Sequence, residues 1–93
     1  MYRVIFAREV LSKDVPKLKS ANLLNQFIKE IDTIKNNPFI GKVLTGPLKG
    51  KRSVRINLQY RIFYTFDRVK LVVDGIEYFG TIKVLQAFGH DFI

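Results

Sequence analysis

The hydrophobic pattern of this chain changes its period once, from helical in the first half to strand-like in the second. Between residues 23 and 34, apolar residues recur every three or four positions, which is the spacing of one helix face. From Lys51 onward, apolar and polar residues alternate, as in strands with one buried face. The pattern predicts a single α+β domain over residues 1–93, in which helices cover one face of an antiparallel sheet.

The N-terminal half carries signals for one strand and two helices. Residues 2–7 (YRVIFA) are β-branched or aromatic and predict a buried strand. Residues 8–18 predict a short helix that is disturbed or ended near Pro16, because proline lacks an N–H and restricts the preceding residue. The clearest helix follows, with Ser20 or Asn22 as its N-cap and the Asn-Asn-Pro sequence at its end. Its predicted core stripe consists of Leu23, Leu24, Phe27, Ile28, Ile31 and Ile34.

An antiparallel pair of strands is predicted after a loop at residues 38–50. Alternation over residues 53–58 indicates a half-buried strand whose polar face carries Arg55. A tight connection leads to a second strand over residues 60–66, on which Arg61 points away from the apolar side. The apolar face of the first of these strands is predicted to hold Val54, Ile56 and Leu58.

The end of the chain is predicted to form a long hairpin. Asp74-Gly75 is a strong signal for a two-residue hairpin turn. Pairing of residues equidistant from this turn would join residues 60–73 to residues 76–89 in one twisted hairpin, whose tip projects beyond the body. One face of the last strand is predicted to hold Ile82, Val84, Gln86, Phe88 and His90.

Charge and composition limit the classes of function. Sixteen basic residues against eight acidic ones give a net charge of +8, which indicates a polyanionic partner. We favour nucleic acid, and a charge that serves only solubility is the simpler alternative. The absence of cysteine excludes disulfides, thiolate metal sites and a cysteine nucleophile, and fits a reducing cytoplasm. We expect no cofactor, no bound metal, no signal peptide and no membrane helix.

Several short motifs occur in a specific order along the chain. Residues 46–67 read GPLKGKRSVRINLQYRIFYTFD, with an L-K-G loop, a strand ending in Arg-Ile, and Tyr-Arg-Ile-x-Tyr. KDVPKL and NNPFIG precede this run, and VLQAFGHD follows it. This set resembles the RelE/ParE superfamily of bacterial toxin–antitoxin toxins over nearly the whole chain. The resemblance implies a RelE-like fold: an N-terminal strand, two helices, then an antiparallel sheet with a long C-terminal hairpin.

The resemblance implies one of two activities. RelE-, HigB- and YoeB-like members are ribonucleases that generally cut mRNA in the ribosomal A site, which inhibits translation, whereas ParE-like members inhibit DNA gyrase. We favour a metal-independent endoribonuclease that acts on mRNA on the ribosome, is neutralised by a cognate antitoxin, and is able to form a homo-oligomer. The alternatives are a ParE-like gyrase inhibitor without nuclease activity and an inactive relative that keeps only an antitoxin or DNA-operator role.

The resemblance also assigns a set of cations to the scissile phosphate. Arg61 matches the family's arginine in Tyr-Arg-Ile, and Arg55 matches a basic position on the preceding strand. Adjacent antiparallel strands can present both on one face, about 5–8 Å apart, where planar guanidinium groups would clamp phosphate oxygens. Lys49 would assist from the preceding loop, and Lys51 and Arg52 would attract RNA. Without the resemblance, a solvated strand face explains the same arginines.

Proton transfer is assigned to His90, the only histidine, which matches the family's C-terminal histidine after glycine. An incidental histidine near a terminus is the alternative. Two departures point to reduced activity: Gly46 replaces a glutamate of YoeB-like members, and the tyrosine that many members carry near the C-terminus is missing. Tyr60 or Tyr64 could substitute, although tyrosines beside strands more often serve packing.

The segment from Arg68 to Gly80 is a further departure, because the family's last two strands are usually joined by a short turn. A lengthened tip is one interpretation of this segment. A contact with the antitoxin, the ribosome or a second copy is the other.

Overall fold

The computed structural model describes the backbone of residues 1–90 and the side chains of residues 1–87. No helix in this part of the chain combines the length and the apolar character needed to cross a membrane. The elements are, in chain order, β1 (Arg3–Phe6), the π-helical turn η1 (Val10–Asp14), α1 (Val15–Ser20), α2 (Leu24–Asn36), the 3₁₀ turn η2 (Pro38–Ile40), β2 (Lys42–Val43), the 3₁₀ turn η3 (Gly46–Leu48), β3 (Arg52–Arg55), β4 (Tyr60–Phe66), β5 (Leu71–Val73), β6 (Ile76–Tyr78) and β7 (Thr81–His90).

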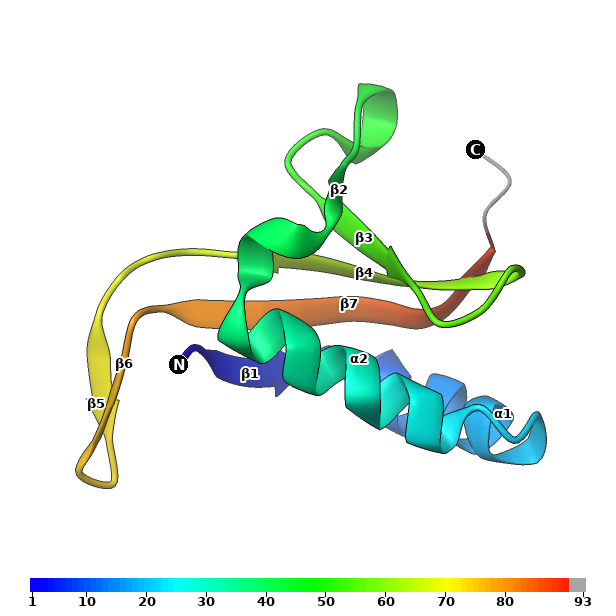
Figure 1. Ribbon diagram of the computed structural model, residues 1–93, viewed down its shortest axis with the longest axis horizontal. Coiled ribbons are helices and arrows are strands. Elements are labelled where there is room, and N and C mark those ends of the chain that lie inside the picture. The colour runs from blue at the N-terminus through cyan, green and yellow to red at the C-terminus, as the bar shows by residue number, and fades with distance from the viewer. Residues whose placement is uncertain (91–93) are drawn as a thin grey trace.

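The main sheet has five strands in the order β1-β7-β4-β3-β2, and the helices lie along one face of it (Figure 1). Strands β3, β4 and β7 pair antiparallel, as predicted. β2 also pairs antiparallel with β3, although residues 38–50 were predicted to be a loop. β1 instead pairs parallel with β7, so that Arg3 lies opposite Thr81. The predicted α+β architecture is confirmed, and the parallel pair joins the beginning of the described chain to its end.

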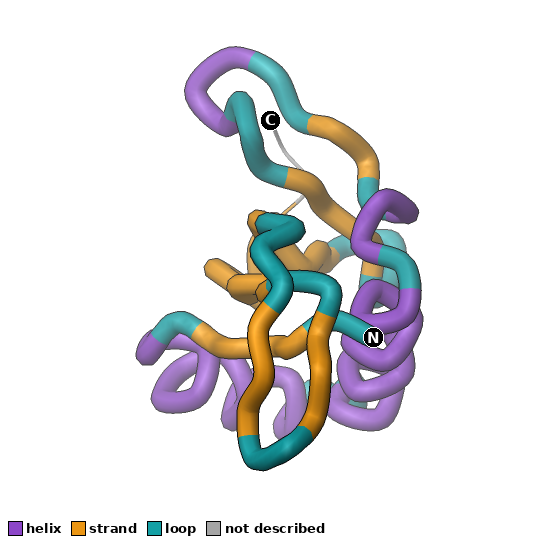
Figure 2. The backbone as a smooth tube through the Cα atoms, turned by 90° about the vertical axis from the view of Figure 1, so that its left-hand side faces the viewer, coloured by secondary structure: helices purple, strands orange, loops and turns teal. Residues whose placement is uncertain are grey.

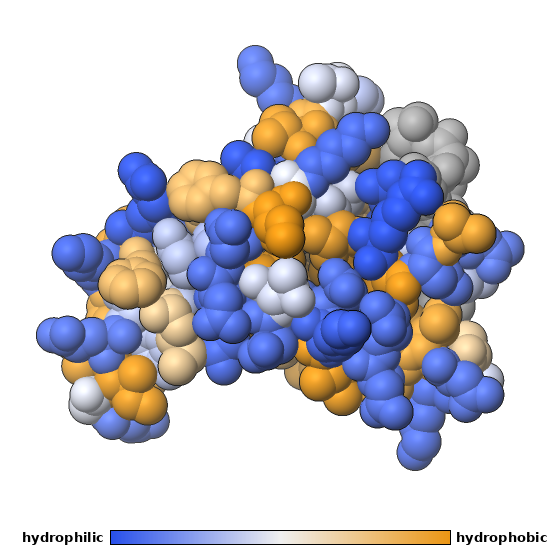
Figure 3. Space-filling model, viewed as in Figure 1, coloured by the Kyte–Doolittle hydropathy of each residue, from blue (hydrophilic) through white to orange (hydrophobic). Residues whose placement is uncertain are grey.

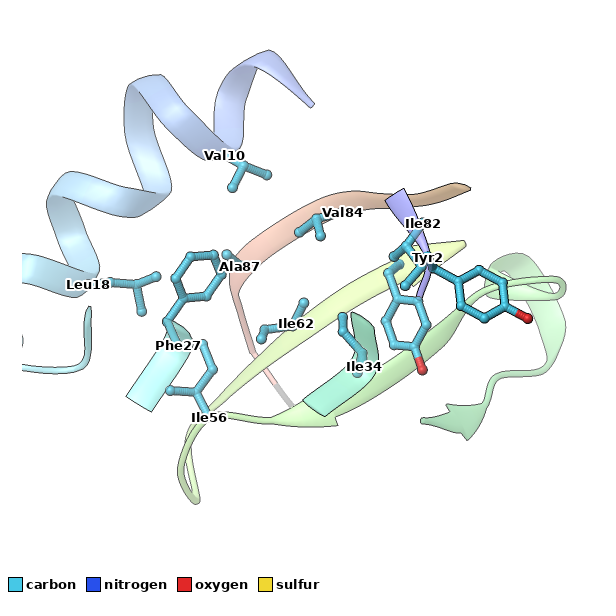
Figure 4. Packing of buried hydrophobic residues seen from close by; sticks show 11 residues of the cluster. Tyr2, Val10, Leu18, Phe27, Ile34, Ile56, Ile62, Ile82, Val84 and Ala87 are labelled. Atoms are coloured by element: carbon cyan, nitrogen blue, oxygen red, sulfur yellow. The ribbon is translucent and has the colours of Figure 1, made fainter. Parts of the chain in front are cut away.

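The core lies between the helices and the main sheet (Figure 4). Phe27 and Ile34 of α2 are buried, and Leu23, Leu24 and Ile31 pack against the core, so most of the predicted stripe is confirmed. Ile28 is 55% exposed, so its predicted core position is wrong. Successive helix residues are rotated by about 100°, which places Ile28 at the edge of the stripe. The cluster of buried core residues consists of Tyr2, Val10, Leu18, Phe27, Ile34, Ile56, Ile62, Tyr64, Ile82, Val84 and Ala87.

The helical segment around Pro16 is disturbed but does not end there. The N–H of Val15 donates to the carbonyl of Val10, which is the five-residue spacing of a π-turn. Pro16 lies in the first turn of α1, where a helix does not need its N–H group, and α1 continues to Ser20. The disturbance therefore falls before the proline, in η1.

The connection between α1 and α2 corrects the predicted helix cap. Ser20 ends α1, and Asn22 has a left-handed backbone with φ of 58°. The N–H of Leu23 donates to Leu18 at 2.8 Å and that of Asn22 donates to Lys19 at 3.2 Å, which is a Schellman motif closing α1. Neither Ser20 nor Asn22 caps α2, whose N-cap residue is Leu23. Asparagine is used here for the backbone conformation it tolerates.

The C-terminal hairpin is present but is broken into two sheets. Asp74 and Gly75 form the predicted two-residue turn, with φ of 50° and 78°. β5 and β6 form a separate two-stranded ribbon that bends away from the main sheet (Figures 1 and 2). At the bend, Asp67 Oδ1 accepts hydrogen bonds from the N–H groups of Val69 and Thr81. A side chain at Gly80 would collide with the carbonyl of Asp67, so the two chains approach closely at this point.

Two predicted strand faces also differ from the structure. Ile82 and Val84 are buried, but Gln86 is exposed and Ala87 is buried instead, because the β4–β7 register shifts between these positions. The side chains of Phe88 and His90, which were predicted to share that face, lie outside the described residues. β3 ends at Arg55, so Leu58 lies in the connection to β4 and is 87% exposed.

Candidate functional site

The two arginines assigned to the phosphate lie on neighbouring strands. The β3–β4 register places Arg55 directly opposite Arg61. Directly opposite residues of an antiparallel pair project to the same face, with Cα atoms about 4.5–5.5 Å apart. The prediction that both arginines share one face is therefore confirmed. This face is the one that Ser53 and Phe63 also share, opposite the face with buried Ile62 and Tyr64.

Arg61 is buried, with only 8% of its surface exposed. Its Nη1 donates a hydrogen bond at 2.9 Å to Oγ of Ser53, which is 1% exposed. A hydrogen bond from an ionised group is stronger than one between neutral groups and holds the guanidinium in a fixed direction. The alternative of a solvated strand face therefore does not describe Arg61, whereas Arg55 is exposed. Ser53 was not singled out from the sequence, although its position two residues before Arg55 puts both on one face.

The side chain of Arg52 projects from the face of the sheet opposite to the one that carries Arg55. Its Nη1 donates to the carbonyls of Phe39 at 3.1 Å and Gly41 at 3.0 Å. Its guanidinium also lies 5.6 Å from the ring centroids of both Phe39 and Phe66. These contacts tie the η2 turn to β3, which gives Arg52 a structural task besides the RNA attraction predicted for it.

Lys49 and Lys51 lie in the segment between β2 and β3. Lys49 follows η3 and is exposed, and the carbonyl of Lys51 accepts a hydrogen bond from the N–H of Leu44. β3 runs from Arg52 to Arg55, so the lysines precede one end of the strand and Arg55 ends the other. The three-residue step from Arg52 to Arg55 spans about 10 Å, so this length of strand separates the lysines from Arg55. Their predicted roles toward RNA stay predictions.

The last strand returns beside the strand that carries Arg61. In the β4–β7 register, the backbone of Gly89 lies opposite Arg61 and that of His90 lies opposite Tyr60. Segments almost thirty residues apart in sequence are thereby brought side by side. The side chain of His90 lies outside the described residues, so its predicted proton transfer stays a prediction.

Tyr64 is part of the core. Its hydroxyl donates to the carbonyl of Pro38 at 2.7 Å and accepts from the N–H of Gly41 at 3.0 Å. Burial raises the pKa of Tyr64 above its ordinary value of 10.0, against the smaller opposing effects of the Gly41 hydrogen bond and the charge of Arg52. Tyr64 therefore serves packing, while Tyr60 is half-buried opposite His90.

Gly46 stands where YoeB-like members carry a glutamate. Its φ is +64°, and open space surrounds the position that a Cβ would take. The left-handed backbone, rather than lack of room, favours glycine here, because a side chain at this φ is strained. The structure therefore places a left-handed glycine at the start of η3, at the position where the resemblance implies a glutamate.

No protein-family model and no curated protein sequence matches this chain. Solved structures match it over nearly its whole length. A YoeB/ParE toxin from Agrobacterium tumefaciens superposes with a TM-score of 0.72 at 20% sequence identity, covering 95% of this chain and 98% of that chain.

The chain has the fold of the YoeB/ParE toxins.

Two further structures from Staphylococcus aureus agree with this assignment. A YoeB-YefM complex matches with a TM-score of 0.65 at 24% identity, covering 97% of this chain and 98% of that chain. A YoeB dimer matches with a TM-score of 0.66 at 23% identity, covering 96% of this chain and 97% of that chain. The expected RelE-like fold is confirmed.

Figure 3 shows that hydrophilic side chains cover much of the YoeB-like domain on the face it presents, with apolar side chains gathered between them. The net charge of +8 makes the surface as a whole attractive to polyanions. Among the basic residues, Arg55 and Arg61 are distinguished by their positions opposite each other on neighbouring strands and by the burial of Arg61.

Proposed function

We propose that this protein is the toxin of a toxin–antitoxin system and cleaves mRNA on the ribosome, in the cytoplasm, without a metal ion. The observation that carries the proposal is Arg61, which is buried, bonded to Ser53 and directly opposite Arg55. Two guanidinium groups on adjacent strands repel each other and are well suited to share one phosphate group. The YoeB-like fold supports the same assignment.

The proposed reaction uses the 2′-hydroxyl of the RNA as the nucleophile. Its oxygen attacks the adjacent phosphorus while its proton passes to solvent water, the new P–O bond closes a 2′,3′-cyclic phosphate, and the bond to the 5′-oxygen of the next nucleotide breaks. Charge accumulates on the non-bridging oxygens, where Arg61 and Arg55 stabilise it. His90 supplies the proton that the departing 5′-oxygen takes up, because an imidazole titrates near neutral pH. Lys49, Lys51 and Arg52 add attraction for the RNA backbone.

A cognate antitoxin is part of the proposal. A net charge of +8 is complementary to an acidic partner, and the similar YoeB structures include a YoeB-YefM complex and a YoeB dimer. We therefore infer an acidic protein partner and a capacity to form a homo-oligomer. An adjacent open reading frame for a small acidic protein with a DNA-binding motif is the observation expected from the genome.

The test is cleavage of mRNA on programmed ribosomes by the purified protein and two variants. The wild type is expected to cut the message, and Arg61→Ala is expected to lower the rate by at least about 100-fold. Arg3→Ala is the matched control, because Arg3 is exposed on β1 and its loss removes the same charge. Intact mRNA with the wild type would contradict the enzymatic proposal. Toxicity that tracks DNA damage and survives His90→Ala would instead favour a gyrase inhibitor.

A further inference from the structure

β7 extends beyond the strand that pairs with it on one side. The last β1–β7 pair joins Phe6 to Val84, and the N–H of Ala7 then donates to the carbonyl of Val84 at 2.8 Å. From Leu85 onward, β4 is the strand neighbour of β7 in the described part of the sheet. An edge of this kind leaves backbone N–H groups that need another acceptor.

Asp14 supplies an acceptor at this edge. Its Oδ2 accepts a hydrogen bond at 2.9 Å from the N–H of Ala87, in a partly buried position. Asp14 ends the π-turn η1, and Val10 and Leu18 on either side of it are fully buried. Figure 4 shows both of these side chains in the same packed cluster as Ala87. The carboxylate is therefore held against β7 by a helical segment that is itself anchored in the core.

The hydrogen bond falls where the β4–β7 register is irregular. Tyr64 pairs with Val84 and Arg61 pairs with Gly89, so β7 advances five residues while β4 advances three. β7 accommodates one extra residue between Val84 and Gln86 and a second between Gln86 and Gly89, and Ala87 lies in the second interval. Regular pairing from Val84 onward would bring Ala87, and not Gly89, opposite Arg61. The irregular register is thus what brings Gly89 and His90 to the end of the site.

We propose that Asp14 is a positioning residue, whose hydrogen bond to Ala87 sets the register that places Gly89 and His90 opposite Arg61 and Tyr60. The proposal gives a task to the KDVPKL motif, which the phosphate site does not use. A π-turn, which is often found at functional positions, directs this side chain to the strand. The consequence for catalysis rests on the proposed ribonuclease function, whereas the effect on register does not.

The test compares Asp14→Ala, Asp14→Leu and Asp14→Asn with Asp32→Ala, a control that removes an exposed carboxylate from α2. Leucine keeps the branched shape but has no acceptor, and asparagine keeps an acceptor. By NMR, the Ala87 amide of the first two variants is expected to exchange at least about tenfold faster, with weaker Arg61–Gly89 backbone contacts. Asp14→Asn and Asp32→Ala are expected to match the wild type. If Asp14→Ala does not fold, Asp14→Leu supplies the measurement of Ala87 amide exchange.

Cleavage kinetics supply the second readout. Loss of the acceptor is expected to lower kcat by about tenfold with little change in KM, since the cations that attract RNA stay in place. Wild-type exchange and register in Asp14→Leu would overturn the proposal, and so would an altered register with unchanged kcat. A wild-type protein that does not cleave RNA would refute the proposed function, while the NMR comparison would still decide the register.

Discussion

Replacing Tyr64 by phenylalanine removes a hydroxyl that bridges two buried backbone groups and leaves the ring in place. The change breaks the bond to the Pro38 carbonyl and the bond from the Gly41 N–H. At about 1 kcal/mol for each hydrogen bond, the free energy of unfolding is expected to fall by about 2 kcal/mol at neutral pH. For a domain of this size, that corresponds to a Tm lower by roughly 8–16 °C.

The difference between the two proteins is expected to depend on pH. Burial raises the pKa of Tyr64 in the folded state above 10.0, so the unfolded state ionises first as the pH rises. The stability that the neutral hydroxyl contributes is fully present below about pH 10 and is lost as the pH rises through the folded pKa. Tyr64→Phe lacks this contribution at every pH. The difference in the free energy of unfolding between the wild type and the variant is therefore expected to shrink above pH 10.

Urea unfolding followed by circular dichroism between pH 7 and pH 11 measures both effects. Tyr78→Phe is the control, because Tyr78 lies on the β5–β6 ribbon outside the main core. At a temperature where every variant is folded, cleavage by Tyr64→Phe is expected to equal that of the wild type. Unchanged stability at neutral pH, or loss of cleavage by a folded Tyr64→Phe protein, would refute the structural role of the hydroxyl.

Three further changes test the bend and the arginine pair. Gly80→Ala is expected to destabilise the fold by about 1–3 kcal/mol in urea titration, because its methyl group would collide with the carbonyl of Asp67, and an equally stable variant would contradict the close approach. Ser53→Ala removes the 2.9 Å bond that orients Arg61 and is expected to lower kcat/KM by about 10- to 100-fold, with wild-type kinetics counting against that role. Arg55→Gln is expected to reduce the rise in Tm that sulfate produces, since it removes one half of the anion clamp, and an undiminished rise would place the anion elsewhere.

Local patterns predicted the elements that local sequence determines. β4 begins at Tyr60 and ends at Phe66, as alternation indicated, and Asp74-Gly75 forms the predicted turn. The end of α2 at Asn36 follows from the residues after it. In each case the pattern that indicates the element lies within a few residues along the chain, so the sequence alone reveals it.

The features that escaped prediction depend on contacts between distant segments. Nothing near Arg3 indicates that β1 will pair parallel with β7, because the partner lies at the other end of the described chain. The extra residues of β7 lie where this strand contacts β4 and where the N–H of Ala87 bonds to Asp14, and a repeating alternation cannot show them. The sharp bend at Gly80 likewise depends on the backbone of Asp67.

The candidate site was predicted in part. Alternation on two consecutive strands is enough to put Arg55 and Arg61 on one face, and the register confirms it. The burial of Arg61 and its bond to Ser53 depend on how the strands pack, which charge patterns do not reveal. Arg52, next in sequence to Ser53, turns instead to the carbonyls of the η2 turn.

The position of β7 has a consequence for when this protein can become active during its synthesis. β7 is inserted between β1 and β4, yet it is made after every other strand of the main sheet. β4, which carries Arg61, therefore cannot pair with β7 until the codons for residues 81–90 have been translated. A nascent chain whose message is cut before those codons lacks an interior strand and cannot assemble the phosphate site. If the mature protein cleaves mRNA as proposed, cleavage of its own message before those codons yields inert fragments, and its production limits itself.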